Sequence, residues 1–212
     1  MRMKTRIIQA EHVDGAGQAL DLLRSGELVA FPTDTVYGLA ALPWDDEAVR
    51  RLYQVKERPE DLPIPLLLSD AAQLERVAVL SERCRALPGR FWPGGLTLVL
   101  PKTAAVSPAI SRRPTVAVRV PDLALTRDLI GEAGGVLAVT SANISGEISP
   151  VTAQQVEAQL GERIPLILDG GRCREGVAST IVDCSVSPPL LLRRGAVSEA
   201  DLRAVIGALR LV

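Results

Sequence analysis

Short apolar runs alternate with amphipathic segments along the whole chain. Each apolar run is rich in Val, Ile or Leu and is bounded by Gly, Pro or polar residues, which is typical of buried strands. These runs predict strands over Leu28–Phe31, Ile64–Leu68, Leu96–Leu100, Thr115–Val120, Val136–Thr140, Leu166–Leu168, Thr180–Val182 and Leu190–Leu192.

The amphipathic segments repeat their apolar positions every three or four residues, which predicts helices. The expected helices are Ala16–Ser25, Asp46–Lys56, Ala71–Val79, Glu82–Leu87, Leu123–Glu132, Ala153–Leu160 and Glu199–Leu209. Asp45 is the expected N-cap of the second helix, and Ser198 and Asp201 have capping-box spacing at the start of the last.

Alternating strands and helices favour an α/β domain built around one large sheet. The last strands follow one another at hairpin spacing, so we expect a mixed sheet with parallel and antiparallel strands. No repeat, low-complexity tract or linker interrupts the pattern, and we expect residues 1–212 to form a single domain. Pro59–Pro65 and Lys102–Pro114 are only weak candidates for a hinge.

Charge and composition limit the classes of partner. The 24 basic and 25 acidic side chains give a formal charge of −1, and aromatic residues make up only 3%. A dedicated nucleic-acid binder is usually far more basic and often stacks bases on aromatic rings, so we expect any RNA contact to be local or transient. No run of roughly 18 apolar residues and no signal-peptide pattern is present, so we expect a cytoplasmic protein with no membrane span.

Histidine and cysteine are scarce. Cys84, Cys173 and Cys184 form no CxxC pair and are odd in number, which disfavours a disulfide framework and a zinc site. His12 is the single histidine, so a Ser-His-Asp triad or a His-based metal site would depend on it alone. We therefore expect chemistry based on Lys, Arg, Ser, Thr, Asn and Asp.

Four polar side chains follow the first predicted strand. Thr33, Asp34, Thr35 and Tyr37 lie directly after Pro32, at the end of a strand where α/β folds collect ligand groups. The alternative is a turn whose Thr and Asp side chains bond their own backbone. The density of polar groups favours a functional role.

Two cations end the second predicted helix. Lys56 and Arg58 precede Pro59 and would complement the helix dipole, which is the structural alternative. An Arg fork beside a Lys charge also suits a triphosphate. Because both lie at a helix end, we expect truncation of either side chain to leave the fold intact.

An arginine interrupts the strand Thr115–Val120. The period of two places Val116 and Val118 on one face, and Thr115 and Arg119 on the other. Burying Arg119 is costly unless it meets an anion, and the alternative is a sheet face open to solvent.

Further polar clusters follow the later strands. The strand Val136–Thr140 ends in SANISG, with Ser149 just beyond, which fits a capped turn or a nucleotide pocket. No GxxxxGK[ST] motif is present, so a P-loop is excluded. The remaining clusters are Asp169–Gly171, Ser179–Thr180 and Arg193–Gly195.

These segments together resemble the YrdC/Sua5 family of threonylcarbamoyl-AMP synthases. The matching motifs run in order as FPTDTVYGL, KERP, FWPGGLTLVL, TVAVRVP, TSANISG, SPVTA, ILDGG, GVASTIVD and LLRRGAVS. The resemblance implies an α/β fold of the YrdC/RibB type, with a twisted mixed sheet, flanking helices and a large, positively lined concave cleft. The chain ends soon after LLRRGAVS, so we expect the short, single-domain form.

The resemblance also implies an activity. Members condense L-threonine, bicarbonate and ATP to threonylcarbamoyl-AMP and pyrophosphate, and tRNA-modifying transferases use the product at adenosine 37 of tRNAs that read ANN codons. Lys56 and Arg58 would be catalytic, and Mg²⁺ would arrive with ATP. The implied ATP-binding residues are Lys56, Arg58, Thr115, Ser141, Asn143, Ser149 and Arg193, and the implied threonine-binding residues are Thr35, Tyr37, Arg119 and Ser179.

The chain departs from the family pattern at three positions. Leu62 stands where the family commonly has Asn, Leu67 where it has His, and Ala178 where it has Glu. We expect contacts to ATP and threonine to differ there.

Two other functions fit the same segments. One is a non-catalytic double-stranded RNA or tRNA-binding module, which the near-neutral charge and scarce aromatics disfavour. The other is a carbamoyl-adenylating domain of the hydrogenase-maturation type. Such a domain is accompanied by zinc fingers, which the three isolated cysteines of this chain could not supply.

Overall fold

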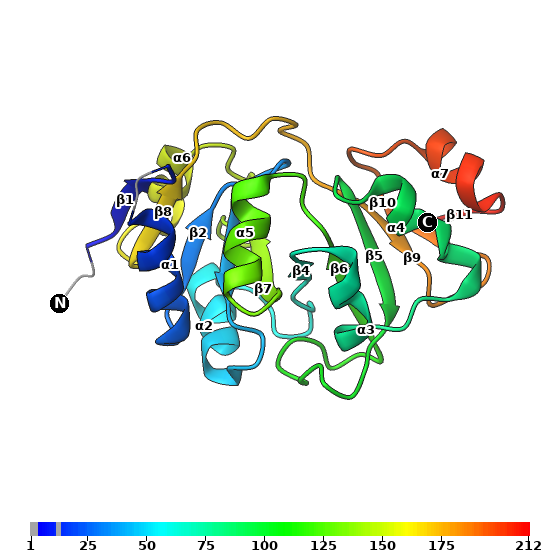
Figure 1. The fold of residues 1–212 in the computed structure, drawn as a ribbon, viewed down its shortest axis with the longest axis horizontal. Coiled ribbons are helices and arrows are strands. Elements are labelled where there is room, and N and C mark those ends of the chain that lie inside the picture. The colour runs from blue at the N-terminus through cyan, green and yellow to red at the C-terminus, as the bar shows by residue number, and fades with distance from the viewer. Residues whose placement is uncertain (1–3, 12–13) are drawn as a thin grey trace.

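One sheet of eleven strands organises the chain, in the order β1-β8-β2-β3-β7-β4-β6-β5-β9-β10-β11 (Figure 1). The computed structural model describes residues 4–11 and 14–212, so His12 lies outside the described residues. The strands are β1 (Arg6–Gln9), β2 (Val29–Phe31), β3 (Gly38–Ala41), β4 (Leu66–Leu68), β5 (Leu96–Pro101), β6 (Thr115–Arg119), β7 (Val136–Ser141), β8 (Leu166–Asp169), β9 (Thr180–Asp183), β10 (Leu190–Arg193) and β11 (Arg210–Leu211).

Seven α-helices and two short 3₁₀ helices, η1 and η2, connect the strands in the described part of the chain. Their bounds are α1 (Gly15–Arg24), α2 (Asp46–Lys56), η1 (Ala71–Gln73), α3 (Leu74–Val77), η2 (Glu82–Cys84), α4 (Ala86–Phe91), α5 (Ala124–Glu132), α6 (Ala153–Leu160) and α7 (Glu199–Ile206). Of these, α2 and α6 have the predicted bounds, and the expected caps at Asp45 and Ser198 are present.

The sheet is mixed, as predicted. Among its neighbouring strand pairs in the described residues, five are parallel and five are antiparallel. The last long strands, β9 and β10, form the antiparallel pair that their spacing indicated. The expected α/β fold with an open mixed sheet and flanking helices is confirmed.

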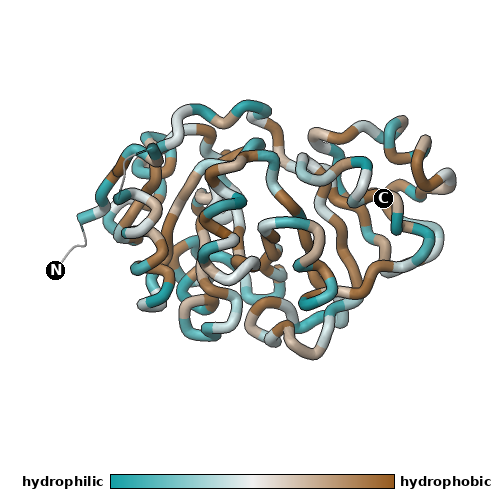
Figure 2. The backbone as a smooth tube through the Cα atoms, viewed as in Figure 1, coloured by the Kyte–Doolittle hydropathy of each residue, from teal (hydrophilic) through white to brown (hydrophobic). Residues whose placement is uncertain are grey.

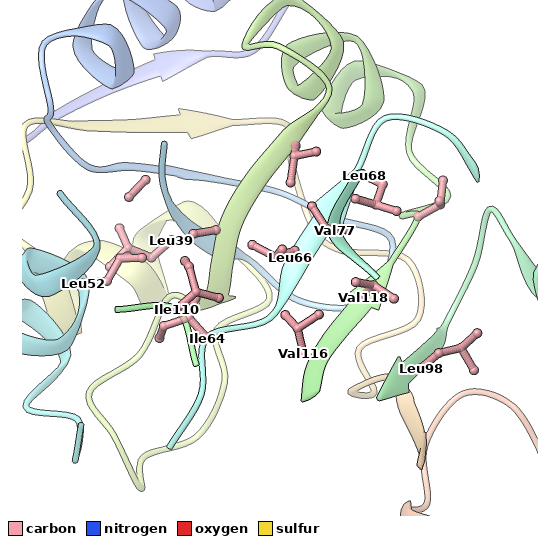
Figure 3. Packing of buried hydrophobic residues seen from close by; sticks show 14 of the residues in the cluster. Leu39, Leu52, Ile64, Leu66, Leu68, Val77, Leu98, Ile110, Val116 and Val118 are labelled. Carbon is pink, nitrogen blue, oxygen red and sulfur yellow. The ribbon is translucent and has the colours of Figure 1, made fainter. Parts of the chain in front are cut away.

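Alternate residues of β2, β3, β4, β7 and β8 enter two separate cores, because successive side chains of a strand point to opposite faces. Leu23 of α1 and Ile130 of α5 pack with Phe31 on one face of the sheet. Leu52 of α2 packs with Leu66 on the other face (Figure 3). Figure 2 shows the hydrophobic segments concentrated along the central strands. The sheet therefore has a core on each side, and α5 lies beside β4 and β7.

All eight predicted strands are present, and three short ones were missed: β1, β3 and β11. The β3 strand reads Gly-Leu-Ala-Ala, a composition with weak strand preference. A Cβ atom at Gly38 would lie 2.7 Å from Cγ1 of Val139 on β7. Glycine is thus required where β3 approaches β7, and that requirement removes the apolar side chain that would have marked the strand.

Three predicted helices differ from the observed ones. The segment predicted as one helix over Ala71–Val79 is a 3₁₀ turn followed by one α-helical turn. The helix predicted over Glu82–Leu87 is instead a 3₁₀ turn over Glu82–Cys84 followed by the separate helix α4, whose first turn contains Pro88, a position where proline is tolerated. The last helix stops at Ile206 because Gly207 follows with a φ of 69°.

No helix in the described ranges 4–11 and 14–212 is long and apolar enough to cross a membrane.

Candidate functional site

A cleft of about 470 Å³ opens on the face of the sheet where β4, β5, β6, β7 and β9 lie side by side. That volume falls within the range of small-molecule sites. Its floor consists of alternate strand residues, including Leu67, Val99, Ala117, Val139 and Ile181. The predicted strand Thr115–Val120 therefore has the expected orientation: Val116 and Val118 enter the core, and Thr115 and Arg119 line the cleft.

Arg119 is held by three acceptors at one end of the cleft. Its Nε donates to the carbonyl of Gly94 (2.9 Å), its Nη1 to Oγ1 of Thr35 (2.8 Å) and its Nη2 to Oδ1 of Asp34 (2.5 Å). Only 5% of Arg119 is exposed. The anion that the buried arginine required is thus a carboxylate of the protein itself, from the polar cluster after β2.

The turn after β2 is fixed by its own hydroxyl groups. Oγ1 of Thr33 donates to the carbonyl of Val36 (2.7 Å) and accepts from the amide of Thr35 (3.2 Å). The hydroxyls of Thr33 and Thr35 are also bonded to each other (3.1 Å). The predicted turn is therefore present, and it also places Thr35 against Arg119 and in the lining of the cleft.

Ser179 and Arg193 form a second hydrogen-bonded group in the same cleft. Arg193 donates through Nε and Nη2 to the carbonyl of Ser179 (3.0 and 2.8 Å), and through Nη2 to its Oγ (3.0 Å). Oγ of Ser179 is also bonded to Oγ1 of Thr97 (2.7 Å). A Cβ atom at Gly195 would lie 2.3 Å from the carbonyl oxygen of Ala178, so this glycine allows the close approach that joins the two segments.

The other predicted ATP-binding residues divide into two sets. Arg58, Thr115, Ser141 and Ser149 line the cleft. Arg58 is partly buried, donates to the carbonyls of Leu62 (3.2 Å) and Pro63 (3.0 Å), and has its pKa lowered by burial. The remaining two, Lys56 and Asn143, are not among the cleft-lining residues.

Lys56 is buried behind the cleft, with 1% of its surface exposed. Its Nζ donates to the carbonyl of Ser141 (2.5 Å) and to that of Asn143. Burial, together with the nearby charge of Arg58, lowers the pKa of Lys56 to about 7. The expectation that truncating Lys56 would leave packing untouched is wrong, because this helix end is covered.

Asn143 lies in the turn that Lys56 holds. Its Nδ2 donates to the carbonyls of Ile144 (2.8 Å) and Glu147 (2.9 Å). Its Oδ1 is buried and has no hydrogen-bond partner in the described structure. Asn143 therefore stabilises the turn after β7 through its Nδ2, while its Oδ1 can still accept a hydrogen bond.

Tyr37 lines the cleft, and its hydroxyl is bonded to the segment after β8. The hydroxyl donates to the carbonyl of Gly171 (2.7 Å) and lies 3.3 Å from Oδ1 of Asp169. Burial, with the charge of Asp169, raises the pKa of Tyr37 above its ordinary value. Tyr37 therefore stays neutral and ties the cleft wall to the loop after β8.

Positive charge exceeds negative charge among the residues that line the cleft. Arg58, Arg113, Arg119 and Arg193 contribute guanidinium groups, whereas Asp183 is the carboxylate in the lining. A concave surface with excess cations raises the local concentration of anionic ligands. The site suits a ligand that carries several negative charges.

Sequence reasoning missed four polar residues of the cleft: Thr97, Arg113, Thr140 and Asp183. Thr97 and Asp183 could have been found by strand periodicity, because each lies on the cleft-facing side of its strand. Arg113 lies in the loop before β6, where no periodicity applies. No three His, Cys, Asp or Glu side chains in residues 4–11 and 14–212 lie close enough together to hold a metal ion.

The three departures from the family pattern occupy different places. Leu67 and Ala178 line the cleft, so their side chains alter its surface directly. Leu62 is 38% exposed and takes part through its carbonyl, which accepts from Arg58 and from the hydroxyl of Tyr53. Only the first two therefore change what a ligand in the cleft would touch.

An α/β sheet with a cationic cleft on its open face is the architecture that the sequence resemblance implied. The family model Sua5_yciO_yrdC, with the description telomere recombination, matches residues 21–195. The chain belongs to this family.

Two similar proteins have the same name. The chain is 45% identical over 193 residues to "Threonylcarbamoyl-AMP synthase" of Bacillus subtilis, covering 90% of this chain and 56% of that protein. It is 43% identical to the protein of the same name from Pyrococcus abyssi, covering 91% and 57%. The chain thus spans about half the length of these two relatives.

A solved structure matches closely. "Crystal structure of P. abyssi Sua5 complexed with L-threonine" superposes with a TM-score of 0.94 at 41% identity, covering 98% of this chain and 63% of that one. The fold is therefore that of a protein crystallised with threonine.

Proposed function

We propose that this chain condenses L-threonine, bicarbonate and ATP into threonylcarbamoyl-AMP and releases pyrophosphate. The observation that carries the proposal is the cleft, in which four arginines line a surface and hydroxyl groups gather at one end. The 45% identity to the Bacillus protein supports the same reaction.

The reaction needs no protein nucleophile. The threonine amine adds to CO₂ with loss of a proton, or condenses with bicarbonate with loss of water, to give a carbamate. The carbamate oxygen then attacks the α-phosphorus of ATP, forming the new P–O bond as the bond to pyrophosphate breaks. Positioning and neutralisation of phosphate charge can supply the rate in such transfers. The excess of guanidinium groups over carboxylates in the cleft fits that demand.

Threonine would bind in the part of the cleft that Thr35, Arg119 and Ser179 line. Arg119 makes three hydrogen bonds within the described structure and has five N–H groups, so one N–H on each terminal nitrogen is left for a ligand. That pair suits a carboxylate. Tyr37 would support this end by fixing the wall beneath it.

ATP would lie along the rest of the cleft, in contact with Arg58, Thr115, Ser141, Ser149 and Arg193. Of the two catalytic candidates, Arg58 would act on the phosphates directly. Lys56 would act through the carbonyls of Ser141 and Asn143, to which it is bonded. Mg²⁺ would arrive with ATP, as is usual for nucleotide sites that lack a protein cage.

The product would pass to tRNA-modifying transferase proteins in the cytoplasm, with at most weak direct contact to tRNA. One sheet joins β1 to β11, which supports a single catalytic domain over the chain.

Pyrophosphate release tests the proposal when threonine, bicarbonate and ATP are each omitted in turn. We expect release only with all three, a marked loss in Arg58→Ala, and no change in the matched control Arg50→Ala, whose side chain is exposed on α2. Release that does not need threonine would contradict the proposal. RNA binding indifferent to ATP and threonine would favour a binding module, and turnover with carbamoyl phosphate would favour the hydrogenase-maturation reaction.

A further inference from the structure

The carboxylate of Asp34 is a fully buried charge beside the cleft. Its side chain is fully buried, and that of Arg119 is 6% exposed. Oδ1 accepts from Nη2 of Arg119 at 2.5 Å, whereas Oδ2 is buried and has no hydrogen-bond partner in the described structure. A carboxylate retained with one oxygen unpaired is unfavourable for folding, which calls for a reason beyond packing.

Asp34 itself does not line the cleft, although its neighbours Thr33 and Thr35 do. Its backbone carbonyl accepts from the amide of Glu175, so the residue is clamped between two segments. The carboxylate therefore reaches a ligand only through Arg119. It fixes the plane of the guanidinium from one side, while Thr35 and Gly94 fix it from two others.

We propose that Asp34 is the positioning residue that sets the guanidinium of Arg119 for recognition of the threonine carboxylate. This inference rests on the proposed function. The ion pair leaves one N–H on each terminal nitrogen of Arg119 for the ligand. Without the carboxylate, the guanidinium can rotate or draw in water, and the two free donors lose their orientation.

The first test is Asp34→Asn, which keeps the shape and removes the charge. We expect the KM and the Kd for L-threonine to rise about tenfold or more, since a buried charge pair loses one partner. The kcat at saturating threonine and the Kd for ATP alone should change less than about threefold. A purely structural role would lower the melting temperature and leave the threonine requirement unchanged.

Glu27→Gln is the matched control. Arg51 and Glu27 form an ion pair of the same 2.5 Å length away from the cleft, on partly exposed side chains. Removing that charge should leave the threonine KM unchanged. A rise equal to that of Asp34→Asn would show a general effect of lost ion pairs and would overturn the proposal.

A double-mutant cycle tests whether Asp34 acts through Arg119. If it does, Asp34→Asn combined with Arg119→Lys should raise the threonine KM little beyond the larger single effect. Multiplicative effects would overturn the proposal. If Asp34→Asn fails to fold, Asp34→Glu takes its place: a raised threonine KM with unchanged ATP binding supports the proposal, and equal changes or none overturn it.

The two proposals fail in distinguishable ways. A wild-type protein that neither binds threonine nor needs it for pyrophosphate release removes the proposed function and this inference together. If the wild type binds threonine and needs it for pyrophosphate release, but the Asp34→Asn variant has the same threonine requirement, only the inference about Asp34 is removed.

Discussion

Arg119 and Lys56 are both buried cations near the cleft, but the protein uses them differently. Arg119 is paired with the carboxylate of Asp34 and lines the cleft. Lys56 has only carbonyl partners and lies behind the lining residues. A full counter-charge stabilises the guanidinium, whereas burial without one favours loss of the Lys56 proton.

The difference separates two kinds of sequence signal. A cation within a strand has a face fixed by the period of two, so the orientation of Arg119 followed from its neighbours. A cation at a helix end has no such constraint, because the next elements decide whether that end is covered. For Lys56 the cover is the turn from Ser141 to Asn143, which no local pattern indicates.

The largest expected effect is on stability, at Lys56. Lys56→Ala leaves a cavity and two carbonyls without a donor, so we expect a loss of about 2–4 kcal/mol of unfolding free energy. Urea unfolding measures it, with Arg50→Ala on the exposed face of α2 as the control, expected within about 0.5 kcal/mol of wild type. A neutral Lys56→Ala would remove the contrast drawn between the two cations.

At Arg119 the expected effect is on ligand use. Arg119→Lys keeps the charge but loses the planar fork, and charge-assisted hydrogen bonds contribute about 1.5–3 kcal/mol. The threonine requirement should therefore rise roughly ten- to a hundredfold, with ATP binding in the absence of threonine changing much less. Threonine titrations of pyrophosphate release measure the first quantity, and calorimetry with ATP alone measures the second. Equal impairment of both ligands would contradict the carboxylate assignment.

The lowered pKa of Lys56 makes the free energy of unfolding depend on pH, which gives a second test of the comparison between Lys56 and Arg119. The folded-state pKa is about 7 and the ordinary value is 10.5, so between these values the unfolded chain holds a proton that the folded chain has lost. Stability should therefore rise with pH across this window, by at most about 1.4 kcal/mol per pH unit. Lys56→Met lacks the titrating group. Urea unfolding at several pH values should show that the free energy of unfolding of the wild type increases relative to that of the variant above pH 7. If the free energies of the two proteins change in parallel with pH, the effect is refuted.

Much of the fold followed from hydrophobic periodicity, since every strand with a clear Val, Ile or Leu run was found. The missed strand β3 shows the limit of that method. Its Gly38 is selected by close contact with Val139 on another strand, and such a contact has no local signature.

The site was predictable where a residue's face follows from its strand, as for Thr115 and Arg119. The role of Asp34 was not, because the polar cluster after Pro32 gives no indication that one member pairs with an arginine 85 residues away. The partner of Tyr37 was equally unpredictable. Tyr37 belongs to the same polar cluster in sequence, but its hydroxyl donates to the carbonyl of Gly171 in the loop after β8.

The smallest effect is expected at Ser141, where the two regions meet. Ser141 lines the cleft, and its backbone carbonyl accepts a hydrogen bond from Lys56. Ser141→Ala would remove the one neutral hydrogen bond that we propose for this residue with the nucleotide, and it leaves the carbonyl in place. ATP use should therefore weaken only several-fold, equivalent to about 0.5–1.5 kcal/mol. Titration of ATP in the pyrophosphate assay measures this change, and urea unfolding should show near wild-type stability.

Ser145→Ala, four residues along the same segment and outside the cleft lining, is the control. An ATP dependence unchanged by Ser141→Ala would place the nucleotide elsewhere. A loss of stability as large as that of Lys56→Ala would instead mean that the hydroxyl, and not only the carbonyl, helps to hold the turn that covers Lys56.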